Sequence, residues 1–375
     1  MNFSKLDAFM QSMPARGVPS SALSVTVDGK TVYRADVGYS DVAKTKPAGA
    51  SDLYWLYSAS KVITCIAVMR LVEEGRLSLT DPVKKYLPEF SDMTVKDPDG
   101  TIRPAKSDMT VEQLFTMTAG LDYGTRKPSI QEAIQKGGNT RQIISAMAEN
   151  PLNFDPGTRY CYSFCHDVLA AVAEVVTGMR YADYMNELLF RPLGIVDMGF
   201  HPSPEQESRI ADMYHYRRGA AIPVPITTRN EYCFTPNFDS GGAGLFGSVD
   251  EYMKIITPIA CGGTSENGYQ ILKPETIRLF TENHLSDVQR DDFVTTRRFG
   301  YGFGLCGRVH VDPTVSLCLS PVGEFGWSSA SGHHVLIDIE NRVAFHFATH
   351  LLDCDYAHNM IHPALRNLVY EGLAQ

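Results

Sequence analysis

The chain has 375 residues, of which 44% are hydrophobic and 21% are charged, and its formal net charge is -9 at pH 7. This length and composition predict a large buried core, as one domain or two packed domains, without extensive disorder. The acidic balance disfavours a nucleic-acid-binding protein, which would carry a basic patch. Apolar runs such as VITCIAVM are far shorter than the roughly 20 residues of a membrane-spanning helix.

The N-terminal segment MNFSKLDAFMQSMPARG is expected to form a short amphipathic helix. It lacks the apolar stretch and the small-residue cleavage site of a signal peptide, so we expect a cytoplasmic protein with no membrane partner. The eight cysteines are scattered, which is no disulfide framework in a chain of this size. A cytoplasmic location would keep them reduced.

Two groups of cysteine and histidine were considered as metal ligands. Cys161, Cys165 and His166 lack a matching second pair. A second group would share one face if its segment were helical, and there a polar or half-buried helix face is the favoured interpretation. That group consists of His350, Cys354, His358 and His362. We predict no metal and no cofactor.

Strand patterns occur near both ends of the chain. In ALSVTVDGKTVYRADVGYSD, alternating apolar residues flank Asp28-Gly29, which is typical of a β-hairpin. In HHVLIDIENRVAFHFATH, a turn at Glu340-Asn341 separates two further strands. Because helical sequence lies between the two ends, we expect one antiparallel sheet assembled from both of them.

Helical periodicity dominates from about residue 85 to residue 245, and Gly178 is placed as a helix C-cap. The chain is therefore predicted to have an α/β (α+β) fold, with an antiparallel sheet flanked by helices and a mostly helical inserted domain. We assign residues 1–84 and 246–375 to the sheet domain and 85–245 to the helical domain. The active site is expected between them. The helical segments are TVEQLFTMTAG, IQEAIQKG, TRQIISAMAEN and HDVLAAVAEVVTGMRYADYMNELLF.

Ser58 and Lys61 stand three residues apart where a loop meets a strongly apolar helical segment. A helix that is apolar nearly all round is buried in a domain, so the Lys61 amine is expected to be partly desolvated. Desolvation and the helix dipole both favour the neutral amine, which can accept a proton from the Ser58 hydroxyl. The alternative is that Ser58 is a helix N-cap and Lys61 a surface residue whose amine reaches solvent.

The segment YSASKVIT…VMRLVEEGRLSLTDPVKKYLPEF resembles the serine β-lactamase and penicillin-binding-protein superfamily, which carries an S-x-x-K motif. Within it, the chain is similar to the class C-like branch, which includes family VIII carboxylesterases. MTVEQLFTMTAGLDYG, FDPGTRYCYSFCHDVLAAVAEVVTG, SGGAGLFGSVDEYMKI and GYGFGL follow in the family's order. Ala119 replaces a usual serine.

The resemblance places the family's second motif, Tyr-x-Asn, on Tyr162-Ser163-Phe164. The kept tyrosine implies a proton shuttle between nucleophile and leaving group. Phe164 replaces an asparagine whose amide helps to hold an amide of the substrate, which weakens the case for a true β-lactamase.

The third motif is predicted to fall on Trp327, Ser328 and Ser329, close to the "GWGGAAG" form of esterase-like members. The family's cation for a substrate carboxylate is missing at its first position, although His333 or His334 could compensate from one face of the strand. The resemblance implies a second oxyanion donor in the backbone N–H of Ala330.

The resemblance and these residues predict a serine hydrolase that works through an acyl-enzyme, with Ser58, Lys61 and Tyr162 as catalytic residues. Ser58 and Ala330 would form the oxyanion hole, and we assign substrate contacts to Phe164, Trp327, Ser328, Ser329 and His333. An aromatic lining of Trp55, Tyr57, Tyr162, Phe164 and Trp327 favours an apolar acyl pocket.

The expected substrate is a small molecule, an uncharged ester before an amide, which makes a carboxylesterase the first choice. A class C-like β-lactamase is the second choice and a D-amino-acid peptidase or amidase the third. A protein of another class, acylated at Ser58 without turnover and acting as a sensor or a degenerate binding protein, stays open.

Overall fold

The computed structural model describes residues 1–217, 220–223, 230–294 and 299–375. Within these residues, seven strands form one antiparallel sheet in the order β10-β11-β12-β13-β14-β1-β2. Strands from the two ends of the chain are neighbours, because β1 pairs with β14 from Ala22↔Ala348 to Val27↔Val343. This pairing confirms the sheet predicted from the sequence. The strands are β1 (Ser20–Val27), β2 (Lys30–Gly38), β10 (Tyr301–Gly304), β11 (Gly307–His310), β12 (Phe325–Gly326), β13 (His334–Asp338) and β14 (Val343–Ala348).

Both predicted hairpins are present. Asp28 and Gly29 have φ values of 49° and 79°, so both turn residues are left-handed, as a tight two-residue hairpin turn requires. At the other end of the chain, β13 and β14 pair from His334↔Phe347 to Asp338↔Val343. The second hairpin is the one that carries the predicted third motif towards the site.

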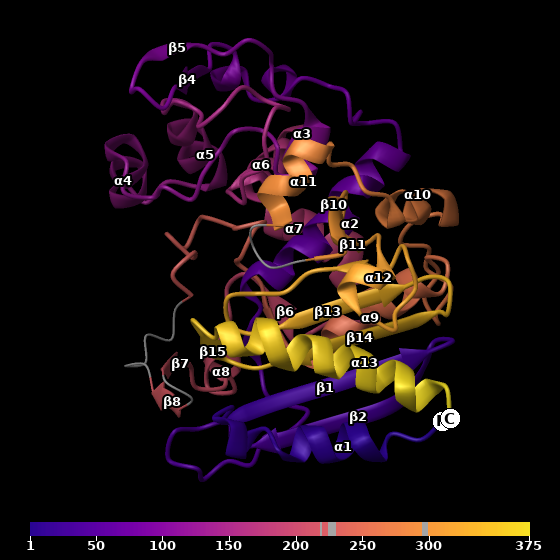
Figure 1. Cartoon of the computed structure of the whole chain (residues 1–375). Helices are drawn as coiled ribbons and strands as arrows, with labels where there is room; N and C mark the ends of the chain where they lie inside the picture. Colours follow the sequence, from indigo (N-terminus) through magenta and orange to yellow (C-terminus); the bar gives the residue numbers. More distant parts are fainter. Residues whose placement is uncertain (218–219, 224–229, 295–298) are drawn as a thin grey trace.

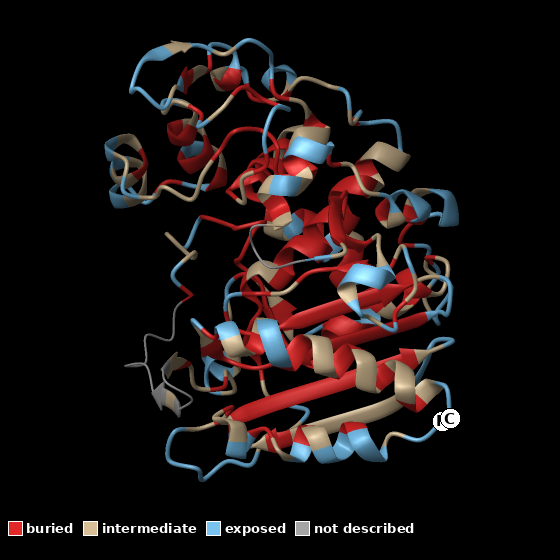
Figure 2. Ribbon diagram, in the orientation of Figure 1, coloured by how far each residue is buried: buried red, intermediate tan, exposed pale blue. Residues whose placement is uncertain are grey.

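Helices cover both faces of the sheet (Figure 1). One face packs against α1 (Ser4–Gln11) and α13 (His362–Leu373), and Leu336 and Phe345 belong to the core on this side. The other face packs against α9 (Val249–Ala260), with Val335 and Ala344 in the larger core that includes α2 (Ser60–Glu73). Figure 2 shows the sheet and α2 as the buried centre of the molecule. The sheet strands are therefore apolar on both faces.

The predicted helical segments lie beyond α2 and contain helices, of which α3 is shorter than its predicted segment and α6 ends at the predicted C-cap, Gly178. Thr110 and Gln113 form a capping box before α3, and Gly178 follows α6 with a φ of 73°. The division into two domains stays a prediction. The helices of this half are α3 (Val111–Phe115), α4 (Pro128–Gln135), α5 (Thr140–Ala148), α6 (Cys165–Thr177), α7 (Tyr181–Met185) and α8 (Pro204–Glu207).

Short elements complete the described structure. The helices are α10 (Pro274–Arg278), α11 (Asp287–Val294) and α12 (Pro313–Ser316). The strands are β3 (Tyr54–Trp55), β4 (Thr94–Lys96), β5 (Ile102–Pro104), β6 (Met198–Gly199), β7 (Tyr214–Arg217), β8 (Ala220–Pro223), β9 (Phe246–Gly247) and β15 (Leu351–Leu352). Single helical turns or π-helical segments cover Pro14–Arg16, Tyr57–Ala59, Val83–Lys85, Pro88–Phe90, Asn186–Phe190, Leu279–Thr281 and Ala357–Ile361.

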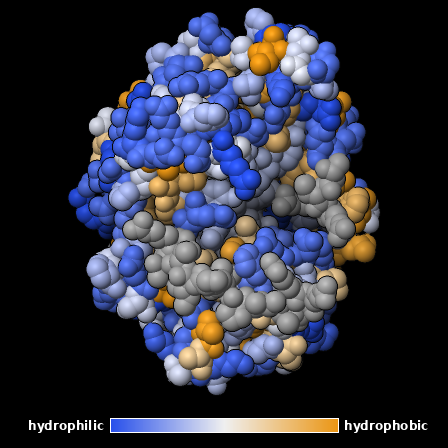
Figure 3. Space-filling view, turned by 90° about the vertical axis from the view of Figure 1, so that its left-hand side faces the viewer, coloured by the Kyte–Doolittle hydropathy of each residue, from blue (hydrophilic) through white to orange (hydrophobic). Residues whose placement is uncertain are grey.

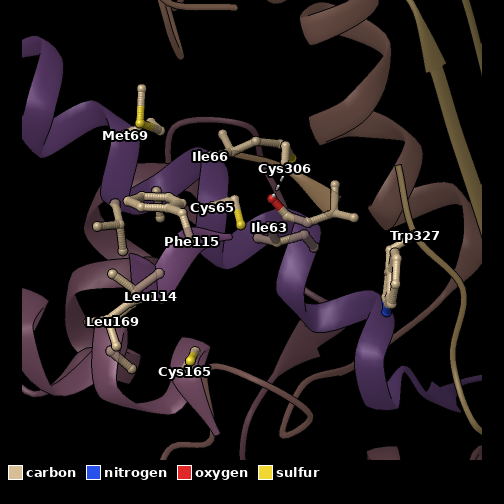
Figure 4. Close-up of a cluster of buried hydrophobic side chains, with 14 of the residues drawn as sticks. Ile63, Cys65, Ile66, Met69, Leu114, Phe115, Cys165, Leu169, Cys306 and Trp327 are labelled. Carbon is tan, nitrogen blue, oxygen red and sulfur yellow. Dashed lines mark hydrogen bonds between the residues drawn. The ribbon is translucent and has the colours of Figure 1, made fainter. Parts of the chain in front are cut away.

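Helix α2 forms the centre of the larger core. Its residues from Ser60 to Met69 are buried, as the apolar sequence predicts. Figure 4 shows Ile66 and Met69 near Leu114 and Phe115 of α3, while Trp327 lies apart from this group. The packing fixes the start of α2 relative to the sheet, with Lys61 in the first turn of α2 and Ser58 in the helical turn just before it.

Hydrophilic residues cover most of the molecular face that carries α4, α5 and β7, and apolar residues form small separate groups on it (Figure 3). In the part of the chain that the structure describes, no helix has the length and apolar character needed to cross a membrane.

Candidate active site

Ser58 lies in the single helical turn that leads into α2. The preceding residue, Tyr57, has a φ of 46°, a left-handed conformation that a non-glycine residue rarely adopts. Backbone bonds hold the turn, since Leu56 N donates to Leu245 O at 2.9 Å and Tyr252 Oη donates to Ala59 O at 2.8 Å. Ser58 is half-buried, whereas its neighbours Tyr57 and Ala59 and the first turns of α2 are buried.

Lys61 is buried, with 3% of its surface exposed, and its side-chain nitrogen has three oxygen partners. Nζ donates to Gly242 O at 2.6 Å, to Tyr123 Oη at 2.8 Å and to Ser58 Oγ at 3.4 Å. The alternative of a surface lysine is therefore wrong. The amine stands within reach of the predicted nucleophile.

Tyr162 adjoins both Lys61 and the third-motif strand. Lys61 Nζ lies 4.8 Å from the centre of the Tyr162 ring, and the Tyr162 hydroxyl accepts a hydrogen bond of 3.0 Å from Trp327 Nε1. The two aromatic rings stack with centroids 5.4 Å apart. The structure thus brings together four of the predicted residues, namely Ser58, Lys61, Tyr162 and Trp327.

Sequence reasoning missed three residues around the Lys61 amine: Tyr123, Asp167 and Gly242. Asp167 is fully buried on α6, where Oδ1 accepts hydrogen bonds from Ser240 Oγ at 2.5 Å and from Gly242 N at 3.3 Å. Burial raises the pKa of Asp167, and the charge of Lys61 opposes this rise. A carboxylate in the apolar segment HDVLAAVA was the available signal in the sequence.

Gly242 has no room for a side chain. A Cβ atom at this position would lie 2.4 Å from Asp167 Oδ2 and 3.3 Å from Lys61 Nζ. The backbone can therefore approach the lysine closely enough to accept its hydrogen bond only because residue 242 is glycine. The Gly-rich turn of the sequence has a structural reason at this position.

An aromatic cluster borders the site, but it differs from the predicted lining. Phe164 is buried against Tyr123, with ring centroids 4.5 Å apart, and Tyr232 contacts both rings. Trp55 instead packs with Leu53 and Phe246, whereas Tyr57 also contacts Tyr232, with ring centroids 6.1 Å apart. The cluster at the site therefore consists of Tyr57, Tyr123, Tyr162, Phe164, Tyr232 and Trp327.

The third-motif strand continues β12 along the edge of β13. Val335 N donates to Trp327 O at 2.8 Å, and Ser329 N donates to His333 O at 3.0 Å. The pairing ends there, because residues 329–332 form a turn closed by Gly332 N, which donates to Ser329 O at 2.9 Å, and Ala330 lies in this turn. Side chains alternate along a strand, so Trp327 shares the face of Val335 while Ser328 shares the face of His334. Ala330 is exposed, and Ser329 is buried beside Ser331.

His333 is fully buried, and its Nδ1 lies 2.9 Å from Nε2 of His346. Burial and the neighbouring histidines lower its pKa well below the usual value. His334 points to the other face of the sheet, where its ring stacks on His362 at 4.5 Å. The role of His333 as a substrate contact stays a prediction that its burial disfavours.

The candidate metal ligands do not come together. Among the described residues, no group of three or more histidine, cysteine, aspartate or glutamate side chains could hold a metal ion. The second group does not lie on one helical face, because His350 and Cys354 precede the helical turns that carry His358 and His362.

Comparisons with known proteins agree with this geometry. A family model described as Beta-lactamase matches residues 6–356. The chain is 31% identical over 368 residues to "Esterase EstB" of Burkholderia gladioli, a match that covers 89% of this chain and 86% of that protein.

Two solved structures have the same fold. "EstCE1, a hydrolase with promiscuous acyltransferase activity" superposes with a TM-score of 0.82 at 24% identity, covering 98% of both chains. A family VIII carboxylesterase superposes with a TM-score of 0.71 at 20% identity, covering 93% of this chain and 91% of that one. The sequence resemblance is thereby confirmed: the chain belongs to the beta-lactamase family and is a serine hydrolase.

Proposed function

We propose that this protein is a carboxylesterase that hydrolyses small esters through an acyl-enzyme on Ser58. The observation that carries the proposal is the buried Lys61 amine, 3.4 Å from Ser58 Oγ. A serine hydroxyl becomes a nucleophile when a neighbouring base takes its proton, and a bond of this length can tighten when substrate binds.

In the first step, Ser58 Oγ attacks the ester carbonyl carbon, and its proton passes to the neutral amine of Lys61. The resulting ammonium has Gly242 O and Tyr123 Oη as fixed acceptors, with the Asp167 carboxylate nearby. These groups stabilise the positive charge without having to reorganise, which is the usual source of electrostatic catalysis.

The carbonyl oxygen becomes negatively charged in the tetrahedral intermediate. Two backbone N–H groups are proposed to hold it, that of Ser58 in the helical turn before α2 and that of Ala330 in the turn after the third-motif segment. N–H groups at the start of a helix lack partners within the helix, which suits the Ser58 N–H to bind an oxyanion.

Tyr162 is proposed to return the proton to the leaving alcohol as the ester C–O bond breaks. Its hydroxyl accepts the Trp327 Nε1 hydrogen bond, which leaves the phenolic proton free to point into the site. Water then attacks the acyl carbon and gives up a proton to the same Lys61–Tyr162 pair. The pair returns this proton to Ser58 Oγ as the bond between Oγ and the acyl carbon breaks and the carboxylic acid leaves.

The aromatic cluster supports an ester with an apolar acyl group as the substrate. By the family resemblance, Phe164 and Trp327 replace an amide and a cation that a β-lactamase uses to bind its substrate. Because both groups are missing, a β-lactamase is only the second candidate.

A cytoplasmic location is proposed, because all eight cysteines are free thiols and a reducing compartment would keep them so.

The test compares the steady-state hydrolysis of a short-chain 4-nitrophenyl ester with that of a chromogenic cephalosporin, using Ser58→Ala as the control. Turnover of the ester far above that of the cephalosporin, and lost in the variant, is expected. Ester turnover that survives in a folded Ser58→Ala protein would sink the nucleophile assignment.

Two other outcomes would identify the remaining possibilities. Stoichiometric acylation of Ser58 in mass spectrometry, without turnover in the assay, would identify a non-catalytic sensor or binding protein. Faster turnover of the cephalosporin than of the ester would make the β-lactamase the better assignment.

A further inference from the structure

A pocket of about 540 Å³ opens on the face of the sheet that α13 covers, directly behind the third-motif strand. This volume lies in the range of small-molecule sites. Arg308 of β11, His334 of β13 and Arg366 of α13 line the pocket, together with Ser328. Ser328 follows Trp327, so one strand separates this pocket from the proposed catalytic groups. We call it the Arg308–Arg366 pocket.

Two buried guanidinium groups line the pocket, and among the described residues one carboxylate, that of Glu324 beside the pocket, forms ion pairs with them. Glu324 is fully buried and accepts hydrogen bonds from Arg308 Nη2 at 2.7 Å, Ser320 Oγ at 3.2 Å and Tyr301 Oη at 3.3 Å. Arg366 Nε lies farther away, at 3.9 Å from Glu324 Oε2. One positive charge is therefore uncompensated among these buried groups.

Several donors of these guanidinium groups are unpaired. Arg308 is 4% exposed and Arg366 is 5% exposed, yet Arg308 Nε, Arg308 Nη1 and Arg366 Nε have no hydrogen-bond acceptor among the described residues. Arg366 Nη1 donates only to the thiol of Cys318, at 2.6 Å, and sulfur is a weak acceptor. Because unpaired buried donors are costly, they favour a ligand with anionic oxygens.

Two of the histidines that line the pocket, His334 and His362, add no further charge at neutral pH. Burial, with the nearby arginines and histidines, lowers the pKa of His334 and of His362 well below the usual value. Asp355 is a carboxylate in the lining, but it is exposed at the rim, where water screens it. The deep part of the pocket is therefore positive.

The rim is apolar on another side. Phe299 and Val315 line the pocket and are 57% and 51% exposed. A planar guanidinium fits a carboxylate through two parallel hydrogen bonds, while an apolar rim fits a hydrocarbon body. We propose that the Arg308–Arg366 pocket binds the carboxylate of a small organic acid with an apolar or aromatic body.

Two sources can supply such a carboxylate: a substituent of the ester substrate, or a separate acid molecule that acts as an effector. The first source rests on the proposed esterase function, because the substrate must then reach from Ser58 past Ser328. The second does not. Binding is therefore measured on the Ser58→Ala protein, so that it stays independent of turnover.

The binding experiment uses benzoate as the probe and benzamide as its neutral counterpart, with calorimetry on the Ser58→Ala protein. We expect saturable benzoate binding and at least about tenfold weaker benzamide binding, the usual scale of a charge-assisted hydrogen bond. Equal binding of both probes, or no benzoate binding, would overturn the proposal.

Two substitutions at exposed lining positions locate the site without disturbing the buried ion network. Asn359→Asp adds a negative charge and should weaken benzoate binding about two- to fivefold relative to Asn359→Gln. Asp355→Asn removes a negative charge and should strengthen binding by a similar factor. If neither substitution changed the affinity for benzoate, the acid would bind elsewhere and the proposal would fail.

Hydrolysis then separates the two sources. For 4-acetoxybenzoate and 4-acetoxybenzamide, the ratio of the two kcat/KM values is measured in the Ser58-containing protein. A ratio that falls in Asn359→Asp and rises in Asp355→Asn supports a carboxylate carried by the substrate. A constant ratio with altered benzoate binding supports a separate acid. If neither ester is turned over while benzoate still binds, the esterase proposal fails and the pocket proposal stands.

Discussion

Two groups of buried ionisable side chains differ in the partners that surround them. Lys61 has three oxygen acceptors and a nearby carboxylate. The histidine cluster, defined here as His333, His346 and His350, has one another and backbone groups as partners. The two groups are therefore equally buried but differ in the partners that surround them.

The difference matters for chemistry. An amine between fixed acceptors can take a proton and hold it, whereas a neutral imidazole deep in the sheet only fills space and hydrogen-bonds. Each substitution below removes a side chain from one of these two groups or from the surrounding active site. The change in rate or stability then shows what that side chain contributes.

The largest effect is expected for Lys61→Met. The side chain keeps its length but loses the base, so kcat/KM for a short-chain ester should fall by about 10²–10⁴, the range of a positioned general base. Lys84→Met, on an exposed turn, is the control and should leave the rate at the wild-type value. A folded Lys61→Met protein with wild-type activity would exclude Lys61 as the base.

Asp167→Asn should have the next largest effect. The substitution keeps the shape of the side chain and removes its charge, so the ammonium formed on Lys61 loses its nearby counter-charge. We expect kcat to fall by about 10–10² while KM changes little, because the carboxylate acts only after the proton has moved. A rise in KM with kcat unchanged would instead mean that Asp167 shapes the binding site.

The sequence predicted most of the fold, because hairpins and apolar helices are local patterns. Asp28-Gly29 specifies its turn by backbone conformation, and the run from Val62 to Met69 specifies a buried helix. Ser58 and Lys61 could be found for the same reason, since one helical turn joins them. Their relation to Tyr162 and Trp327 came from the family resemblance rather than from any local pattern.

The missed residues depend on contacts between distant segments. Tyr123 and Gly242 reach Lys61 from positions 62 and 181 residues away in the chain. No periodicity records such an approach. The Arg308–Arg366 pocket could not be predicted for a similar reason, since its charge balance appears only when β11, β12 and α13 are packed together.

The histidine cluster gives the third prediction, a loss of stability in acid. Burial lowers the pKa of His346 to about 3 and that of His350 to about 4, while in the unfolded chain both titrate near 6.5. The unfolded state therefore binds more protons below pH 6.5. Stability is complete above that pH and decreases as the pH falls towards 4, by about 1.4 kcal/mol per pH unit for each histidine.

Urea denaturation between pH 7 and pH 4.5 measures this slope. His346→Gln should reduce the slope by about one proton, whereas the control His215→Gln, at a half-buried position beside Asp353, should not. An unchanged slope in His346→Gln would show that the imidazole is already protonated in the folded protein.

The smallest effect is expected for Trp327→Phe, and it tests whether the third-motif strand acts on the catalytic groups at all. Phenylalanine keeps an aromatic ring against Tyr162 but removes the Nε1–H donor, whose bond to the Tyr162 hydroxyl is 3.0 Å. One neutral hydrogen bond corresponds to about 0.5–1.5 kcal/mol, so kcat/KM should fall about three- to tenfold. The other tryptophan supplies the matched control, because Trp55 Nε1 is buried and has no hydrogen-bond partner among the described residues. Trp55→Phe should change stability more than rate; if both variants lose rate equally, the Trp327–Tyr162 bond has no specific role, and the strand contributes only its backbone.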